Sequence, residues 1–481
     1  MRPTIAIVLT LLAQGVSVTA TRAAHAQTPS TMPPLSWLEI ANTKLRSVVP
    51  KSAQEFPGTF GNTGPASIIS AWNSATLDTR RSRLILHGGG HADYYGNELY
   101  AFDVGTLTWK RLTDPTPNPT AGTDINSDGT PQARHTYNGT TYISHLDRFF
   151  VFAGSGSTIG ASGFPPTENV WTFDFGANQW SHVNTPPPDG PPHGEGSSAI
   201  YDPATRIVWY GEGQNSGSGA GWGLWAWNQD TRVWTHHTHE SVFSRSTGCL
   251  DSKRGVLVFV GGGAVHTFQV RSGTPRLEDW TTTGDTAIIN QTAPGVAYDP
   301  VLDRVIAWQG GPVYVLNPDT KEWRALDVPG APTPCSNNTY GRFAYIPLVN
   351  AFASINDIDQ NVFFFKHSAG QGQPPPPYDG GIDAGGQDSG NSGTAGTSGT
   401  SGTSGVGGTG PASGGTQGSG AAPSAGSPGS PNAGHSDGDA SGCGCKIARA
   451  SGLSSLAHTL VLLVLSLAGY AVRRTRRRPS T

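Results

Sequence analysis

Basic side chains, cysteine and, over one long stretch, large apolar side chains are all sparse in this chain of 481 residues. Residues 27–368 carry 22 Lys and Arg against 29 Asp and Glu, a net charge of −7. This mildly acidic balance argues against nucleic acid as a partner, because phosphate backbones are bound by clustered Lys and Arg. Cysteine occurs four times, so residues 27–368, which hold Cys249 and Cys335, could close one disulfide at most.

The shortage of large apolar residues divides the chain. Residues 369–442 consist mainly of Gly, Ser, Thr, Pro and Ala. Such a segment cannot bury a core, so it is predicted to be a disordered linker. About 73 residues of flexible chain would have a mean reach of roughly 45–50 Å. The linker would therefore act as a stalk.

Apolar runs occur at both ends of the chain. Arg2, an apolar run over residues 5–12 and small residues up to Ala26 predict a secretory signal peptide over residues 1–26. A mitochondrial-type presequence is disfavoured because arginines are few. At the other end, residues 443–481 hold Cys443-Gly444-Cys445, an apolar run over 453–472 and an Arg-rich end. That run is long enough for one transmembrane helix, and the arginines would hold its end inside.

A unit of about 50 residues recurs between these ends. In its first copy, an apolar run at 84–86 ends in Gly88-Gly89-Gly90, a second run covers 99–102, and a turn leads to Trp109. Five more copies follow, each with a further strand ahead of its glycines, such as residues 67–71 or 199–201. The sixth copy stops without its tryptophan, and residues 36–40, with Trp37, supply the missing strand. Six matching units argue against a β-sandwich.

The glycine cluster, the aromatic residue after it and the tryptophan of each unit resemble kelch repeats of the galactose oxidase/kelch superfamily. The resemblance implies an all-β fold, a six-bladed kelch-type β-propeller over residues 27–368. Stacking is expected physically, because one twisted four-stranded sheet cannot bury its own face. We expect residues 37–42 to pair with 362–366 and close the ring. Cys249 and Cys335 would then lie in blades four and six, and both a disulfide and two free thiols remain open.

The C-terminal order of linker, cysteine motif, single helix and arginine cluster resembles the MYXO-CTERM surface-sorting tail. This resemblance implies a sorting protease as a partner, cleavage near the cysteine motif and a protein that is secreted and anchored at the bacterial cell surface. An ordinary membrane anchor through the C-terminal helix is the alternative. Both place the propeller outside the cytoplasm.

One rim of the propeller is expected to carry the function. In an antiparallel blade, the start of the first strand, the end of the second and the start of the third all lie at the same rim. Loops after the second strand are long in blades two and three, so we expect a groove over blades one to three. The ligand-binding residues expected there are His91, Asp93, Tyr94, Glu195, Trp222 and Arg245.

Two classes of function are open. The first is a displayed module that binds a glycan or a protein through this rim. The second rests on residues 88–94, which resemble the loop of ulvan-type polysaccharide lyases and imply cleavage of uronate-containing polymers. A lyase needs a cation for the uronate carboxylate, a base and an acid. The rim residues of these types are Arg134, His135, His193, Tyr340 and Arg342.

A copper radical oxidase is disfavoured. It would need a crosslinked Cys–Tyr pair and two histidine ligands, whereas neither Cys249 nor Cys335 has such a setting. Six blades also differ from the seven of that family.

Calcium is the one cofactor that the sequence suggests. Asp124, Asn126 and Asp128 match the opening of a calcium loop, although the twelfth position is His135 and not glutamate. A loop of Asx turns is the alternative. His87, His91 and Asp93 also have metal-ligand side chains, but a histidine beside glycines can equally hydrogen-bond its own loop.

We predict that the tail directs processing and display. Replacing Cys443 and Cys445 by alanine should leave the protein in the inner membrane with its full tail, because the protease would lose its recognition motif. Cell fractionation and intact mass measure both effects. If surface exposure and mass are unchanged in the variant, the tail is a plain anchor.

Overall fold

The structure is a computed structural model that describes residues 27–159, 169–184, 196–212, 223–240, 242–243, 245–273 and 275–375. The predicted signal peptide, nearly all of the linker and the C-terminal segment lie outside the described residues. No helix within the described ranges is long and apolar enough to cross a membrane.

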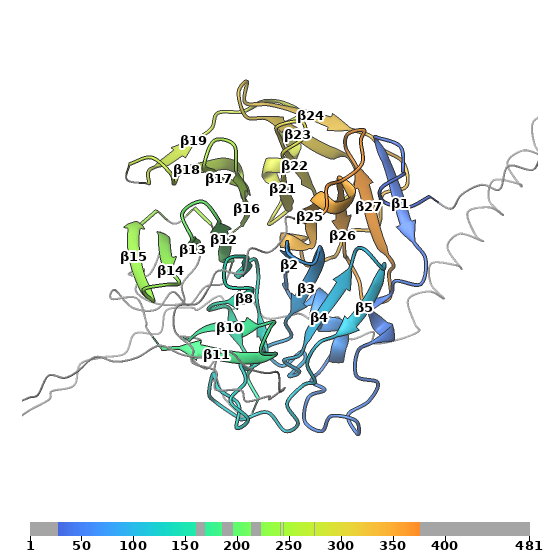
Figure 1. The fold of residues 1–481 in the computed structure, drawn as a ribbon, viewed down its shortest axis with the longest axis vertical. Coiled ribbons are helices and arrows are strands. Elements are labelled where there is room, and N and C mark those ends of the chain that lie inside the picture. Colours follow the sequence, from blue (N-terminus) through green and yellow to red (C-terminus); the bar gives the residue numbers. More distant parts are fainter. Residues whose placement is uncertain are drawn as a thin grey trace, which may run out of the picture. The chain divides into compact units, whose positions relative to one another are not determined.

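Six sheets of mainly antiparallel strands surround a central axis and form a six-bladed β-propeller (Figure 1). Blade one consists of β2 (Ala75–Asp78), β3 (Arg83–His87), β4 (Leu99–Asp103) and β5 (Thr108–Arg111). Blade two consists of β7 (Thr140–Ile143), β8 (Arg148–Val151), β10 (Val170–Asp174) and β11 (Gln179–Val183). Blade three consists of β12 (Ser198–Asp202), β13 (Ile207–Glu212), β14 (Gly223–Asn228) and β15 (Val233–Thr238).

Blade four consists of β16 (Ser246–Asp251), β17 (Val256–Gly261), β18 (Ala264–Gln269) and β19 (Leu277–Asp279). Blade five consists of β21 (Gly295–Asp299), β22 (Arg304–Trp308), β23 (Val313–Asn317) and β24 (Glu322–Leu326). Blade six consists of β25 (Phe343–Ile346), β26 (Ala351–Ser354), β27 (Val362–Lys366) and β1 (Ser36–Ile40). The short elements are β20 (Thr283–Gly284), which pairs with β24, the ribbon of β6 (Arg134–His135) and β9 (Ser155–Gly156), α1 (Ser67–Ser70) and the 3-10 turns η1 (Leu45–Ser47), η2 (Gly64–Ala66), η3 (Thr286–Asn290), η4 (Tyr340–Arg342) and η5 (Pro347–Val349).

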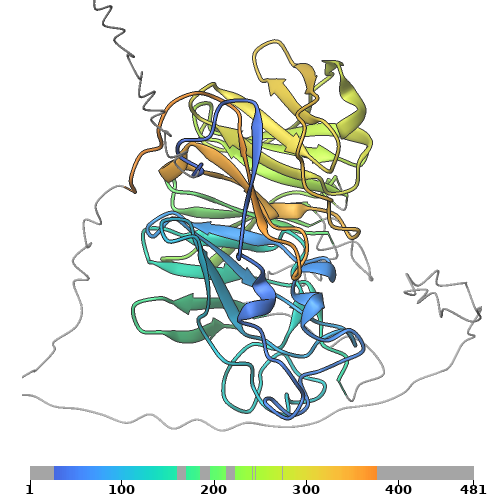
Figure 2. The same cartoon turned by 90° about the vertical axis from the view of Figure 1, so that its right-hand side faces the viewer.

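The ring closes through the N-terminal strand, as predicted. Each innermost strand contacts the next, and β25 of blade six contacts β2 of blade one. Strand β1 pairs with β27, with Trp37 opposite Phe365 and Ile40 opposite Val362. In the side view of Figure 2, β1 (blue) lies along the strands of blade six (orange). The strand ends at Ile40, two residues earlier than predicted, and Asn42 then adopts a left-handed backbone with φ 63°.

The segment after β1 joins blade six to blade one. Trp109 Nε1 donates a hydrogen bond to the Thr43 carbonyl at 2.7 Å, and Val362 N donates to Thr43 Oγ1 at 2.8 Å. Thr43 therefore contacts the outer strand of one blade and the third strand of the other. The closing strand thus fixes its blade and also the interface with the next blade.

The hydrophobic core lies between the blades. Successive side chains of a strand point to opposite faces, so each inner strand serves two interfaces. Leu84 and Leu86 pack in the cluster that contains Phe364 of blade six, whereas Ile85 packs with Trp171 of blade two. The remaining interfaces have clusters of the same kind. Every blade is therefore buried on two faces by its neighbours.

The rim that carries the turns between first and second strands is filled by ion pairs. Four of the first strands end in an aspartate whose carboxylate accepts backbone N–H groups of the turn that follows, at Asp78, Asp202, Asp251 and Asp299. Charges also pair across blade interfaces. Arg81 binds Asp147 of blade two at 2.5 Å, and Arg254 of blade four binds Asp303 of blade five at 2.5 Å.

Two expectations need comment. Residues 67–71 are not a strand: Gly64 and Pro65 begin a helical turn that continues into α1, because proline is well suited to the first turn of a helix. The first strand of blade one is β2 instead. Cys249 and Cys335 are free thiols, in β16 and in the loop before blade six.

We predict that the closure is essential for stability. Removing residues 27–42 should destabilise the whole ring, because β27 becomes an unpaired edge and Thr43 loses its support. Trp37→Ala alone should cost roughly 2–4 kcal/mol, since its ring lies 5.4 Å from Trp308 and 5.2 Å from Phe365. Leu35→Ala, at a side chain that is 51% exposed, is the control. A truncated chain that melts at the temperature of the parent would show that the closure is unimportant.

Candidate functional site

Three glycines bring the loop after β3 against blade two. A Cβ at Gly90 would lie 2.5 Å from the Arg134 carbonyl carbon and 2.5 Å from His135 N, and Gly90 has φ 83°. A Cβ at Gly88 would lie 2.3 Å from the Asn73 side chain. Only glycine permits such close approach of two backbones. The loop therefore crosses directly over β6 and places His91 beside His135.

His91, Asp93 and His135 form a compact polar cluster at this crossing. The two imidazole rings are 3.9 Å apart between centroids, and His135 Nε2 lies 3.1 Å from Asp93 Oδ2. One ligand atom from each residue falls within 4.8 Å of the others, so these are the side chains that could hold a metal ion. His135 is fully buried, while the Asp93 side chain is 21% exposed. The cluster thus opens to solvent on the Asp93 side.

A second loop braces the cluster from outside. The Asp93 carbonyl accepts hydrogen bonds from Thr63 N and Gly64 N, both at 3.1 Å, and Asn62 N donates to the Ala92 carbonyl at 2.7 Å. His91 itself has a left-handed backbone with φ 46°, and its amide bonds the Gly156 carbonyl. Both sides of the loop are therefore tied down, which fixes the direction of its side chains.

Aromatic residues with left-handed backbones stand next to the cluster. Trp72, Tyr137 and Tyr340 have φ of 52°, 49° and 49°, and each lies three residues before an innermost strand. The Trp72 ring is 5.2 Å from His135, and Tyr137 lies 6.2 Å from His135 and 6.1 Å from Tyr340. Trp72 is half-buried, whereas the two tyrosines are buried. Bulky residues rarely adopt this conformation, and such strain concentrates at functional sites.

Burial keeps the histidine of the loop uncharged. Desolvation and, secondarily, the neighbouring His135 lower the pKa of His91 to about 3, although Asp93 opposes the shift. The neutral imidazole can accept a proton or bind a cation through a ring nitrogen. The Nδ1 atom of His135 is buried and has no hydrogen-bond partner among the described residues.

The two arginines that were expected to meet a ligand are internal. Arg134 is fully buried and forms an ion pair with Asp124, and it donates to the Ala153 carbonyl at 3.2 Å. Arg342 is also fully buried, and its guanidinium donates to the carbonyls of Asn73, at 2.7 Å, and Ile355, at 3.0 Å. Both serve to connect blade segments, so neither is accessible to an anionic ligand.

The other predicted residues have varied positions. Tyr94 is fully buried beneath the loop, where its hydroxyl donates to Glu98 at 2.6 Å, so it cannot offer a face to a ligand. Burial raises the pKa of Glu98. Arg245 is exposed just before β16. Three predicted residues lie outside the described residues: His193, Glu195 and Trp222.

The predicted calcium loop is held by internal contacts. The Asp124 carboxylate bonds Arg134, Asn169 at 2.9 Å and Trp171 at 3.1 Å. Asp128 accepts bonds from Thr116 and Thr130, both at 2.7 Å, and Asn126 Oδ1 accepts one from Thr120 N. Each carboxylate oxygen of this described loop thus has a partner, and calcium would have to displace these contacts.

His87 does not lie with His91 and Asp93, although all three have metal-ligand side chains. It is fully buried at the end of β3, with its ring 5.4 Å from Trp180, and burial followed by the charge of Arg134 lowers its pKa to about 3. The second histidine beside His91 and Asp93 is His135 and not His87. The sequence analysis also missed Trp72 and Tyr137, although an aromatic residue followed by asparagine precedes the inner strand in both blades.

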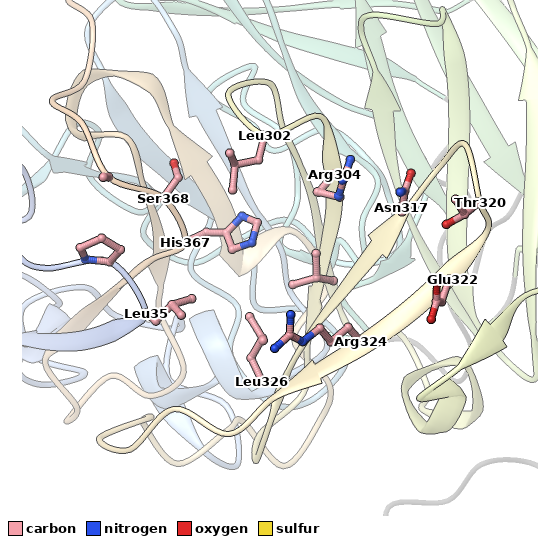
Figure 3. A pocket seen from close by; sticks show the side chains of 13 residues that line it. Leu35, Leu302, Arg304, Asn317, Thr320, Glu322, Arg324, Leu326, His367 and Ser368 are labelled. Carbon is pink, nitrogen blue, oxygen red and sulfur yellow. The ribbon is translucent and has the colours of Figure 1, made fainter.

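A separate groove of about 770 Å³ lies on blade five and the N-terminal segment (Figure 3). Leu35 and Leu302 line it and are 51% and 44% exposed, and Arg304 and Arg324 add charge. His367 also lines it, but its Nδ1 is paired with Asp299 at 2.6 Å. No residue of the His91 cluster contributes to this groove. The cluster brings polar side chains together, whereas the groove offers a concave surface of mixed apolar and charged lining.

Comparisons with known proteins add little. No protein-family profile and no curated protein sequence matches the chain. Among solved structures, it is similar to a fungal alcohol oxidase of the AA5 family in complex with copper, at 12% identity and a TM-score of 0.34. The match covers 61% of this chain and 62% of that one, less than two thirds of its length. A similarity this distant has no bearing on activity.

We predict that Gly90→Ala distorts the cluster. The new Cβ would strain the left-handed backbone and also collide with β6, which should cost roughly 2–4 kcal/mol in unfolding free energy. Gly311→Ala is the matched control, because Gly311 has φ 63° but nothing within 4 Å of its Cβ position. Thermal unfolding compares the two. Equal losses would mean that close packing over β6 has no role.

Proposed function

We propose that this propeller is a carbohydrate-binding module whose ligand contacts the rim at His91, Asp93 and Trp72. One observation carries the proposal. Bulky aromatic residues adopt strained left-handed backbones before three inner strands, beside a braced cluster of two imidazoles and a carboxylate. Strain of this kind persists only where the surrounding structure enforces it.

The chemistry of this rim suits a sugar. A pyranose ring presents a flat C–H face and a ring of hydroxyls, so it is bound by an aromatic face with polar groups beside it. The half-buried Trp72 can supply the first, and Asp93 with His91 the second. These side chains need no rearrangement, because both loops are fixed by backbone hydrogen bonds.

On the opposite rim, many of the described Asp and Arg side chains already have hydrogen-bond or ion-pair partners. Its aspartates accept turn amides, and its arginines pair across the blade interfaces, as Arg271 does with Asp202 at 2.6 Å. Side chains used in this way would lose native contacts if they bound a ligand. The contrast supports the glycine-loop rim as the working face.

A lyase acting on uronate polymers is the second candidate. It is favoured by the hydrogen bond between Asp93 and His135, since a carboxylate that orients an imidazole is the arrangement of a general base. Tyr340, the acid expected from the sequence, contacts Tyr137, whose ring lies 6.2 Å from His135. Against it, Arg134 and Arg342 are engaged internally and cannot neutralise a uronate carboxylate. Binding without cleavage therefore remains the better proposal.

The location of the module follows from its ends. With a signal peptide over residues 1–26 and a sorting tail over 443–481, the propeller would be presented outside the cell on the linker. Its partners would then be an extracellular glycan and the sorting protease. A protein partner is the alternative to the glycan.

A glycan array probed with the full-length protein tests the proposal. Trp72→Asn, chosen because asparagine tolerates a left-handed backbone, should weaken binding about 10-fold or more. Leu302→Ala, in the groove of Figure 3, should leave binding unchanged. The reverse result would place the ligand in the groove and refute the rim.

The lyase alternative has its own readout. Uronate-containing polymers are incubated with the protein, and unsaturated products are followed by ultraviolet absorbance. Cleavage that is lost in His135→Gln, with binding retained, would establish the enzyme in place of the binding module. Binding without any product supports the module.

A further inference from the structure

His91, Asp93 and His135 each offer a metal-ligand atom, and these atoms lie within 4.8 Å of one another. Two residues come from the loop after β3 and one from β6, so the donors meet only because the propeller brings blades one and two together. Asp93 Oδ2 and His135 Nε2 are 3.1 Å apart. Two ligands of a tetrahedral ion with bonds of about 2.0–2.1 Å would be separated by roughly 3.4 Å, so this spacing needs little adjustment.

The donors are held in place before any ion binds. Gly90 crosses β6 with no room for a Cβ, and residues 62–64 hold the backbone around Asp93 from the other side. Beneath them, Tyr94 is anchored to Glu98. A site whose ligands are already fixed loses little conformational entropy on binding, so little of the binding free energy is lost in ordering a loop.

The donor set selects a class of ion. Two imidazoles and one carboxylate suit borderline divalent ions of the first transition row, whereas calcium and magnesium prefer all-oxygen sites. Asp93 supplies a negative charge next to two imidazoles. Three protein ligands also leave a coordination position for water or a further ligand.

We propose that His91, Asp93 and His135 bind a divalent transition metal ion, for which zinc is the probe. The ligand atom of the fully buried His135 would be Nε2, which faces Asp93, and the ion would replace the hydrogen bond between these two side chains. The ion would also account for two imidazole rings whose centroids lie 3.9 Å apart, at 31° to each other, beside a single carboxylate. The site does not depend on carbohydrate binding, so it can be tested without a glycan.

Equilibrium metal binding tests the proposal. The full-length protein is stripped with a chelator, titrated with zinc against a chromophoric competitor, and analysed for retained metal after dialysis. We expect a high-affinity zinc site in the parent. Asp93→Asn and His91→Asn should weaken it at least about 10-fold, and asparagine suits the left-handed backbone at residue 91.

The controls separate this site from other binding. His266→Ala removes a histidine that is paired with Asp279 at 2.6 Å but belongs to no described three-residue cluster, so it should bind zinc as the parent does. Asp93→Asn keeps the shape of its side chain, and circular dichroism and thermal unfolding establish that the variants fold. Cobalt added in place of zinc should give visible bands without thiolate charge transfer, because no cysteine is a ligand.

Three results would overturn the proposal. The first is equal zinc affinity in the parent and in Asp93→Asn. The second is no retained transition metal in the parent, which would leave Asp93 and His135 as a hydrogen-bonded pair. The third is preference for calcium over zinc. Glycan binding that fails while zinc binding persists would refute the proposed function and leave the metal site intact.

Discussion

Burial of both faces of every blade is the constraint on which this propeller depends. The clusters that hold the fold lie between sheets, so no sheet has a core of its own. Strand β1 meets that constraint at the point where the chain would otherwise leave an open edge. Thr43, just beyond it, bonds both neighbouring blades. The N-terminal strand β1 therefore covers the edge of β27, the last strand of the described chain.

The backbone N–H and C=O groups have different hydrogen-bond partners on the two rims of the ring. On one rim, aspartates accept hydrogen bonds from the turns, and several ion pairs join one blade to the next. On the other, residues before the inner strands adopt left-handed conformations, and their amides bond carbonyls of neighbouring blades, as Tyr137 N does with Trp72 O at 2.7 Å. Backbone groups bind one another there, so side chains remain available for other partners.

The candidate site results from backbone packing as much as from side chains. Glycines at residues 88 and 90 let one loop approach another chain segment more closely than any side chain would allow. That contact sets His91 over His135 and directs Asp93 to the same place. A metal ion bound there would add an electrophile next to Trp72, so that a sugar could coordinate the ion through its hydroxyls and stack its C–H face on the indole. The two proposals meet at this point but rest on different contacts.

The repeat pattern in the sequence was enough to predict the blades, their number and the closing strand, because strand periodicity and turn glycines are local properties of the chain. The repeat also placed His91, Asp93 and His135 on one rim, and the three side chains do lie together there. Tertiary structure alone decided which side chains meet. Arg342 donates to the carbonyls of Ile355 and of Asn73, which is far away in sequence, and Tyr94 is buried in the core. Both side chains look available in the sequence and are not. Trp72 lies beside His135 because a left-handed turn follows a helix that stands where a strand was expected, and long-range contacts, not local preference, determine where that segment lies.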